Sequence, residues 1–538
     1  MKLMTYVKQR VPLLLAAALL LAPAIPGKAQ AEPAPAFDDI ASSYARTQIN
    51  GLVQKNIMNG TGDRSFSPER PITRAEFIAA LDRVLKLQPL SSAIPAFTDV
   101  PADAWFYGWV QAGVELGIVD GVSASRFAPN QSITRQEAAA LLVKALKQSG
   151  SAAASPASST FSDASRISSW AVPYVEQIRQ LGLMNGDQGQ FRPNDPITRQ
   201  ETAVVIDKLV NGSRWSTALQ ASPAPLIQLG WQYNQTEEQF KQNVLDANIN
   251  TLSPRWFFLD AAKGIEDAAS PDLVSWAHRN GKKVWPLVGN RFDKQYTHQV
   301  LSDPAKAEAA AQQLAQFTDK YSLDGLNIDF ENVDAADRQA LTSFISSLAS
   351  KLHASNKTLS VNVSPDTGTD WTEAFDFAAL GQSADYVVLM AYDEHWDGDV
   401  TAGSVSSLPW LSAGVQTLLA SVPAGKAIVA LPFYTRDWTD TAGIASSTEL
   451  TIREQLEVVD ATGMTPQWNP VLGQYTSNYV YNRISHAIWL EDSRSLSAKY
   501  QVGLANHVAG FAYWSSGGET PDVWISLMNR LQYDAYSF

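Results

Sequence analysis

The sequence predicts two kinds of fold in one chain: an all-helical array of three repeats, then an α/β barrel of eight strands with a small insertion. Three similar blocks, repeating about every 60 residues, lie within the first 210 positions. After Pro225, short apolar runs alternate with helical stretches. One of these runs, from Leu323 to Glu331, has polar side chains on one face and apolar side chains on the other.

The first 31 residues are typical of a secretory signal. Three basic residues precede an apolar run from Val11 to about Ala24, and Ala29-Gln-Ala31 provides a cleavage site. A membrane helix is the alternative interpretation, but this run is shorter than the ~20 residues that span a bilayer. We therefore expect residues 1–31 to be removed and no membrane span to remain.

Composition narrows the possible partners. The 538 residues suffice for two to four domains. Removal of the leader would leave 37 basic against 54 acidic residues, a net charge of −17, which argues against nucleic acid and anionic lipid as partners. The chain has no cysteine, so an exported protein of this kind relies on core burial rather than disulfides. These features favour a bacterial protein secreted to its own cell wall.

We assign the repeats to residues 32–92, 93–150 and 151–212, followed by a linker at 213–224. Each block predicts a helix, a glycine-containing turn and a second helix. A threonine followed three residues later by glutamate forms a capping box before the second helix, because the hydroxyl accepts from an amide and the glutamate reaches back. The three pairs are Thr73 with Glu76, Thr134 with Glu137, and Thr198 with Glu201.

An arginine follows each capping threonine, at Arg74, Arg135 and Arg199. We expect these side chains to lie at an exposed first helical turn. A single arginine there is usually a solvated charge that slightly opposes the helix dipole. Its recurrence in three blocks favours an anion-binding role.

The blocks resemble S-layer homology (SLH) domains through their F-x-D, G-x-x-x-G and I-T-R-x-E elements. The resemblance implies a three-fold assembly whose grooves bind a pyruvylated secondary cell-wall polysaccharide. Arg74, Arg135 and Arg199 would contact the acidic ketal, and Trp105 and Trp170 match the early tryptophan of the family. The first block departs from the pattern, with Tyr44 near the tryptophan position and Asn56 in place of glycine, so its groove is the weakest match.

Residues 225–538 predict a (β/α)8 TIM barrel, because strand-like runs alternate with helical segments eight times. The longer stretch from Ile444 to Gln474 would be an insertion before the last strand. The eight runs are Leu226–Trp231, Ile249–Phe258, Lys283–Val288, Leu323–Glu331, Leu359–Val363, Tyr386–Tyr392, Ala427–Phe433 and Val508–Trp514.

Polar and aromatic residues gather at the carboxyl ends of the later runs, where such barrels carry their reacting groups. An isolated strand with two carboxylates would more often be a solvated edge, but the convergence favours a catalytic site. The residues are Asp329, Glu331, Met390, Tyr392, Asp393, Glu394, Tyr434, Arg436 and Trp514.

This domain resembles glycoside hydrolase family 18, the chitinase-like barrels. The family pattern D-G-x-D-x-D-x-E stands here as Asp324, Gly325, Asn327, Asp329 and Glu331, and M-x-Y-D as Met390, Tyr392 and Asp393. The resemblance implies hydrolysis beside an N-acetylated sugar with retention, by a route in which the substrate's acetamido oxygen is the nucleophile.

The resemblance also implies roles for the site residues. Glu331 would be the general acid, and Asp329 would hold the acetamido N–H. Tyr392 would bond the acetamido oxygen, and Trp514 would form the floor under the sugar unless it only packs in the core. The remaining residues expected at the substrate are Asn327, Asp324, Met390, Asp393, Glu394, Tyr434 and Arg436.

Asn327 stands where chitinases usually carry aspartate, and it cannot exchange a proton with Asp329. The run Asn-Ile-Asp-Phe-Glu-Asn resembles the branch that cleaves peptidoglycan, including spore-cortex glucosaminidases. We expect an exported enzyme acting on β-linked N-acetylglucosamine in the wall. The alternatives are a non-catalytic glycan-binding envelope protein and a wall-tethered chitinase.

Other chemistries find little support in the sequence. Its six histidines show no metal-ligand spacing, and we expect no metal and no cofactor. No phosphate-binding glycine loop and no G-x-S-x-G elbow occur. His395 and Trp396 follow the strand-six motif and are weaker candidates for the substrate site.

Overall fold

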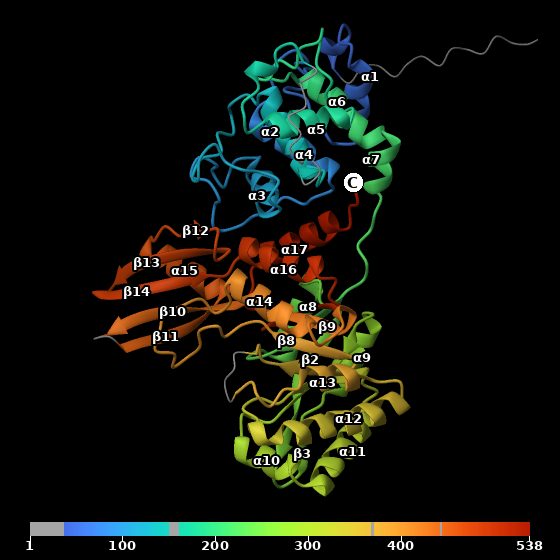
Figure 1. Ribbon diagram of the computed structural model, residues 1–538, viewed down its shortest axis with the longest axis vertical. Helices are drawn as coiled ribbons and strands as arrows, with labels where there is room; N and C mark the ends of the chain where they lie inside the picture. Colours follow the sequence, from blue (N-terminus) through green and yellow to red (C-terminus); the bar gives the residue numbers. More distant parts are fainter. Residues whose placement is uncertain (1–36, 150–160, 367–370, 442–443) are drawn as a thin grey trace, which may run out of the picture.

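The computed structural model describes residues 37–149, 161–366, 371–441 and 444–538 (Figure 1). The predicted leader lies outside these residues. The helical array sits at one end of the molecule, and the barrel lies at the other (Figure 1).

The array consists of short helices with the capping boxes at the predicted threonines. In each box the threonine hydroxyl accepts from the glutamate amide, and the glutamate accepts from the threonine amide. The predicted linker contains a helix, α7, whose Trp215 is buried in the core of the array. The elements are η1 (Asp38–Ile40), α1 (Arg46–Gln54), α2 (Arg74–Val84), α3 (Tyr107–Glu115), α4 (Arg135–Ala145), η3 (Ala164–Arg166), α5 (Val172–Gln180), α6 (Arg199–Asn211) and α7 (Ser213–Ala218).

The three repeats close on one another within a single chain. The amide of Ile72 donates to the carbonyl of Ile197 at 3.0 Å, Ile133 donates to Ile72 at 3.1 Å, and Ile197 donates to Ile133 at 3.1 Å. Each repeat thus donates one bond and accepts one at the same position, which gives the array a three-fold internal symmetry.

The second domain is a closed barrel of eight parallel strands, as predicted. The ring runs β1-β15-β9-β8-β7-β6-β5-β2 and closes through pairing of β1 with β2. Each of the eight predicted runs contains one of these strands. They are β1 (Ile227–Gln232), β2 (Thr251–Asp260), β5 (Leu287–Gly289), β6 (Gly325–Asp329), β7 (Thr358–Val363), β8 (Tyr386–Met390), β9 (Ala427–Pro432) and β15 (Gly510–Trp514); the short β3 (Gly264–Asp267) and β4 (Lys283–Val284) also pair with β2.

Helices surround the strands, so the apolar face of each strand is buried against them. Leu326, Ile328 and Phe330 belong to this outer layer, whereas Trp231 and Tyr392 belong to a separate cluster inside the barrel. The helices are α8 (Glu237–Asp246), α9 (Pro271–Arg279), α10 (Lys294–Leu301), α11 (Pro304–Lys320), η4 (Ala335–Asp337), α12 (Arg338–Ala354), α13 (Phe377–Ser383), α14 (Leu408–Leu419), η5 (Ala424–Lys426), α16 (Ser493–Ala505) and α17 (Pro521–Asp534).

The insertion is larger than the predicted span of Ile444 to Gln474. It forms a five-stranded antiparallel sheet in the order β11-β10-β14-β13-β12, which projects to one side of the barrel (Figure 1). Tyr434 and Arg436, expected at the end of a barrel strand, instead open the first strand of this sheet. Its elements are β10 (Tyr434–Thr441), β11 (Ile444–Thr451), α15 (Ile452–Thr462), β12 (Gln467–Asn469), β13 (Gln474–Tyr481) and β14 (Ile484–Leu490).

Helices α16 and α17 join the barrel to the array (Figure 1). The rings of Tyr533 and Tyr536 lie among the apolar side chains of the array, and the Tyr536 hydroxyl donates to the carbonyl of Leu85 at 2.8 Å. Gln88 and Asn529 exchange two hydrogen bonds of 2.8 Å. The two domains therefore share a packed interface. No helix within the described part of the chain combines the length and apolarity needed to cross a membrane.

Candidate active site and anchoring grooves

A line of hydrogen bonds crosses the barrel interior and ends at Asp329. Asn327, fully buried on β6, accepts from the Trp231 indole at 2.9 Å and donates to Asn362 at 2.7 Å. Asn362, on the neighbouring β7, donates in turn to a carboxylate oxygen of Asp329 at 2.8 Å. Asn327 therefore acts on Asp329 through Asn362, and the line fixes the orientation of that carboxyl group.

Glu331 lies just beyond the end of β6, on the same face as Asp329. The side chain of Asn290 makes two hydrogen bonds to the backbone of Glu331. It accepts from the Glu331 amide at 3.1 Å and donates to the Glu331 carbonyl at 2.7 Å. Burial raises the pKa of Glu331 well above its ordinary value, and the negative charges of Asp329 and Asp393 raise it further. A raised pKa favours the protonated form of the carboxyl group, which is the form that a general acid needs.

Tyr392 and Asp393 follow β8 and face the same carboxylates. Burial raises the pKa of Tyr392 well above its usual range, with further contributions from the charges of Asp329 and Glu331, so its hydroxyl remains a hydrogen-bond donor. The Tyr434 hydroxyl donates to Asp393 at 2.5 Å. Burial raises the pKa of Asp393, while this bond and the nearby Arg436 oppose the rise.

Trp514, at the end of β15, is partly exposed and touches two further aromatic residues. Its ring centroid lies 5.9 Å from that of Trp231 and 5.2 Å from that of Tyr233. It thus borders the site instead of being enclosed in the core.

Arg255 is a functional candidate that the sequence analysis missed. Its guanidinium lies 5.0 Å from the Tyr233 ring and 6.0 Å from the Trp514 ring. Its positive charge also lowers the pKa of both Asp329 and Glu331, against the effect of burial. A charged residue within the apolar run Ile249–Phe258 was the available signal.

Three exposed aromatic side chains follow the strand ends around the barrel mouth. Phe292, Trp371 and Trp396 follow β5, β7 and β8 and expose 51%, 38% and 53% of their surface. The first two have ring centroids 6.3 Å apart. Exposed aromatic faces beside a polar site are suitable for stacking on sugars.

Three residues expected at the substrate have other environments. Asp324 lies at the opposite end of β6 from Glu331, where it accepts from the Val284 amide at 2.8 Å. The carboxylate of Glu394 accepts from the amide and hydroxyl of Ser407 at 2.6 and 3.0 Å and so fixes the start of α14. Met390 is buried in the apolar cluster inside the barrel. These side chains stabilise the barrel through hydrogen bonds and packing, and they lie outside the group around Glu331.

The recurring arginines of the array are buried, contrary to the expectation of an exposed turn. Each reaches into the next repeat, where its Nε donates to a phenylalanine carbonyl and its guanidinium stacks on the same ring at 4.4–5.3 Å. Each also pairs with the capping glutamate of that repeat, because the three-fold closure brings them together. The partners are Phe127 and Glu137 for Arg74, Phe191 and Glu201 for Arg135, and Phe66 and Glu76 for Arg199.

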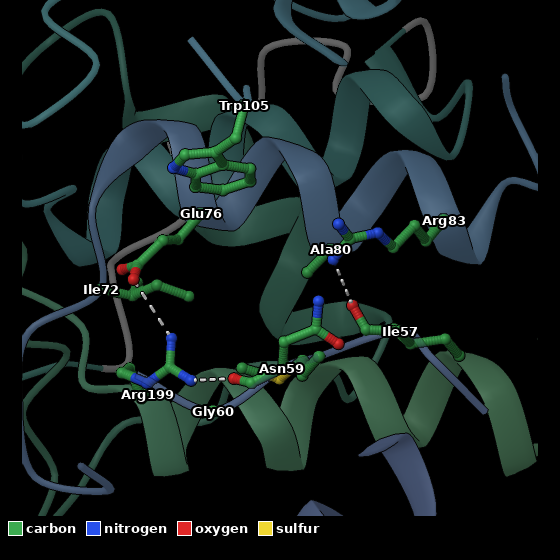
Figure 2. A pocket seen from close by; sticks show the side chains of 10 residues that line it. Ile57, Asn59, Gly60, Ile72, Glu76, Ala80, Arg83, Trp105 and Arg199 are labelled. Carbon is green, nitrogen blue, oxygen red and sulfur yellow. Dashed lines mark hydrogen bonds and ion pairs between the residues drawn. The ribbon is translucent and has the colours of Figure 1, made fainter. Parts of the chain in front are cut away.

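Groove 1, at the first repeat, is a cavity of about 190 Å³ to which all three repeats contribute (Figure 2). Asn59, Glu76 and Arg83 come from the first repeat, Trp105 from the second and Arg199 from the third. Figure 2 shows Trp105 on one side of the cavity, with Arg199 and Asn59 opposite and Arg83 at one end.

Groove 3, at the third repeat, is a cavity of about 760 Å³ with the equivalent lining. Tyr44 of the first block lines groove 3 at the position that Trp105 has in groove 1. The missing tryptophan of the first block therefore changes groove 3 and not groove 1. The equivalents of the groove 1 residues are Asn185, Glu201, Lys208, Tyr44 and Arg135.

Over the described residues, no group of three or more histidine, aspartate and glutamate side chains is arranged to hold a metal ion. Five of the histidines each hydrogen-bond to an aspartate. His395 is one of them, bonded to Asp399 at 2.8 Å.

Profiles of two known families match the barrel and the array. The profile of glycosyl hydrolases family 18 matches residues 236–519, and that of the S-layer homology domain matches residues 36–78, 96–139 and 160–203. The chain belongs to glycosyl hydrolases family 18. It is a family 18 glycosidase that carries three SLH repeats.

Two curated relatives cover different parts of this family 18 chain. An uncharacterized glycosylase of Bacillus subtilis, YvbX, is 29% identical over 295 residues, which are 52% of this chain and 84% of that protein. The surface-layer 125 kDa protein of Lysinibacillus sphaericus is 28% identical over 367 residues, 68% of this chain and 28% of that protein. Among solved structures, the Bacillus cereus spore cortex-lytic enzyme SleL has a TM-score of 0.53 at 20% identity, over 57% of this chain and 75% of that one, which supports the barrel fold.

Proposed function

We propose that this protein hydrolyses β-linked N-acetylglucosamine glycans of the bacterial cell wall while its SLH array holds it at the cell surface. The grouping of Glu331, Asp329 and Tyr392 carries the catalytic part of the proposal. Burial raises the pKa of the Glu331 carboxyl group, and a hydrogen bond holds the carboxylate of Asp329 in place. Tyr392 contributes a buried phenol.

In this mechanism Glu331 protonates the glycosidic oxygen as the bond breaks. Asp329 accepts from the substrate's acetamido N–H, which turns the acetamido oxygen toward the anomeric carbon. Tyr392 donates to that oxygen, and Trp514 supports the sugar ring. The nucleophile belongs to the substrate, so its proximity supplies about 7 kcal/mol or more of the barrier reduction, and configuration is retained.

Arg255 favours the wall polymer over chitin as substrate. Its guanidinium stands beside the site, its Nε has no hydrogen-bond partner, and it forms no ion pair with a carboxylate among the described residues. Peptide-bearing wall glycans contain carboxylates, whereas chitin is neutral, so this cation would attract the first substrate more strongly. The barrel fold shared with SleL, a spore cortex-lytic enzyme, is consistent with this substrate class.

Replacement of Glu331 by glutamine tests the catalytic assignment. We expect Glu331→Gln to abolish turnover of purified sacculi while binding of the glycan persists, and the exposed Glu457→Gln to leave turnover unchanged. Mass spectrometry of products from sacculi and from chitin oligomers identifies the linkage and the preferred polymer. A Glu331→Gln protein with normal turnover would disprove the assignment.

Binding to sacculi tests the anchor. The basic side chains that line the grooves without a carboxylate partner among the described residues, Arg83 and Lys208, support recognition of an acidic wall polysaccharide, and a pyruvate ketal is the acidic group we propose. We expect the protein to sediment with intact sacculi and to remain in solution once the acidic polymer has been stripped. Equal sedimentation with both preparations would contradict the proposed anchor.

A further inference from the structure

The three grooves of the array differ at one loop position. Asn59 and Asn185 occupy this position in grooves 1 and 3, whereas the second repeat has Asp120 there. By the internal symmetry, groove 2 is bordered by Asp120 and Lys144 of the second repeat, Trp170 of the third and Arg74 of the first. The backbone carbonyl of Asp120 accepts from Arg74 at 3.1 Å, just as that of Asn59 accepts from Arg199 in groove 1.

A basic residue stands at an equivalent helical position in each groove. Arg83 in groove 1 donates to the carbonyl of Ile57 at 3.3 Å and stacks on Trp109. Lys208 in groove 3 donates to the carbonyls of Gly182 and Leu183 at 2.8 and 3.0 Å. Within the part of the chain that the structure describes, neither side chain forms an ion pair with a carboxylate.

Lys144, the equivalent residue in groove 2, forms an ion pair with Asp120. The aspartate side chain is 74% exposed, so its charge faces the solvent from which a ligand would approach. Asp120 therefore has two effects on groove 2: it neutralises the ammonium group and it repels an anion.

We propose that the charge of Asp120 prevents acidic ligands from binding in groove 2, so that the array binds its acidic glycan at grooves 1 and 3 alone. This inference rests on the proposed function of the array as an acidic-glycan anchor. Groove 3 is lined by three acidic residues, Glu201, Asp187 and Asp195, which match its three cations, Arg192 included, whereas groove 1 contains Glu76 as its single acidic residue beside two cations. Groove 1 is therefore the tighter site.

Calorimetric titration with a synthetic N-acetylhexosamine bearing a pyruvate ketal tests the inference on the full chain. We expect two sites in the wild-type protein and three in Asp120→Asn. Asn59→Asp should weaken the tighter site by about tenfold or more, because it places a like charge beside the carboxylate of the ketal.

The exposed Asp246→Asn on α8 of the barrel is the matched control, since it changes the net charge equally and should leave two sites. Three sites in the wild-type protein, or two in a folded Asp120→Asn protein, would overturn the inference and leave the anchoring proposal standing. A wild-type protein that binds no ketal would overturn both.

Discussion

Asn362 offers a direct test of how the barrel tunes its catalytic carboxylates. Its amide donates to Asp329 at 2.8 Å, and this bond lowers the pKa of Asp329 against the effect of burial. A hydrogen bond to a charged group contributes about 1.5–3 kcal/mol, and one pKa unit corresponds to about 1.4 kcal/mol. Replacement by alanine should therefore raise the pKa of Asp329 by roughly one to two units.

The assay is kcat/KM against pH on a chromogenic N-acetylglucosamine oligomer. Asp329 must be ionised to accept from the acetamido N–H, so activity falls as pH drops through its pKa. The acidic limb of the Asn362→Ala profile should move upward by about one to two pH units. Ser360→Ala is the matched control, because Ser360 also bonds Asn327 but does not reach Asp329. An acidic limb that stays in place in a folded Asn362→Ala protein would refute the reasoning.

Three further predictions concern stability and substrate choice. Asp82 is fully buried without a hydrogen-bond partner for its carboxyl oxygens, so Asp82→Val should raise the free energy of unfolding by about 1–3 kcal/mol in denaturant titrations; the partly exposed Asp207→Val should not. Burial raises the pKa of Glu115 to about 8 from an ordinary 4.5, so the folded protein keeps a proton that the unfolded chain releases. Stability should therefore fall by about 1.4 kcal/mol per pH unit between these values, and Glu115→Gln should remove that slope; an unchanged slope would exclude Glu115 as its source. Arg255→Met should reduce kcat/KM on sacculi about tenfold more than on chitin oligomers, and equal losses would contradict the proposed substrate preference.

The sequence carried enough information to predict the architecture. Strands of a parallel barrel are buried on both sides, so each left a compact apolar run that could be counted. The capping boxes were equally visible, because both partners lie within four residues of one another. The insertion was harder to delimit: β13 and β14 are partly exposed antiparallel strands with mixed polarity and no such apolar run.

The candidate site was predicted in part. Residues on β6 could be assigned to one face from strand periodicity alone, and the structure places Asp329 and Glu331 there. Asn362 and Asn290 were not foreseen, because they reach Asp329 and Glu331 from β7 and from the end of β5, strands that pair with β6 in the barrel but place these residues 33 and 41 positions away in the chain. The burial of Arg74 also escaped prediction, since its partner Phe127 lies 53 residues away in the next repeat. Local sequence patterns show which side chains share a face of one element, but they do not show which residues from distant parts of the chain pack against that face.

The packing of α17 into the array has a consequence for the order of folding. Tyr533 and Tyr536 follow every barrel strand in the chain, yet they complete the apolar interior of the amino-terminal repeats. Domains generally fold in order of emergence, with the amino-terminal one first. The repeats would therefore be synthesised with part of their interior uncovered, and their packing would be complete only when α17 arrived. The proposed anchor would then become functional only after the barrel strands had been made, so that few copies would bind the wall before they could act.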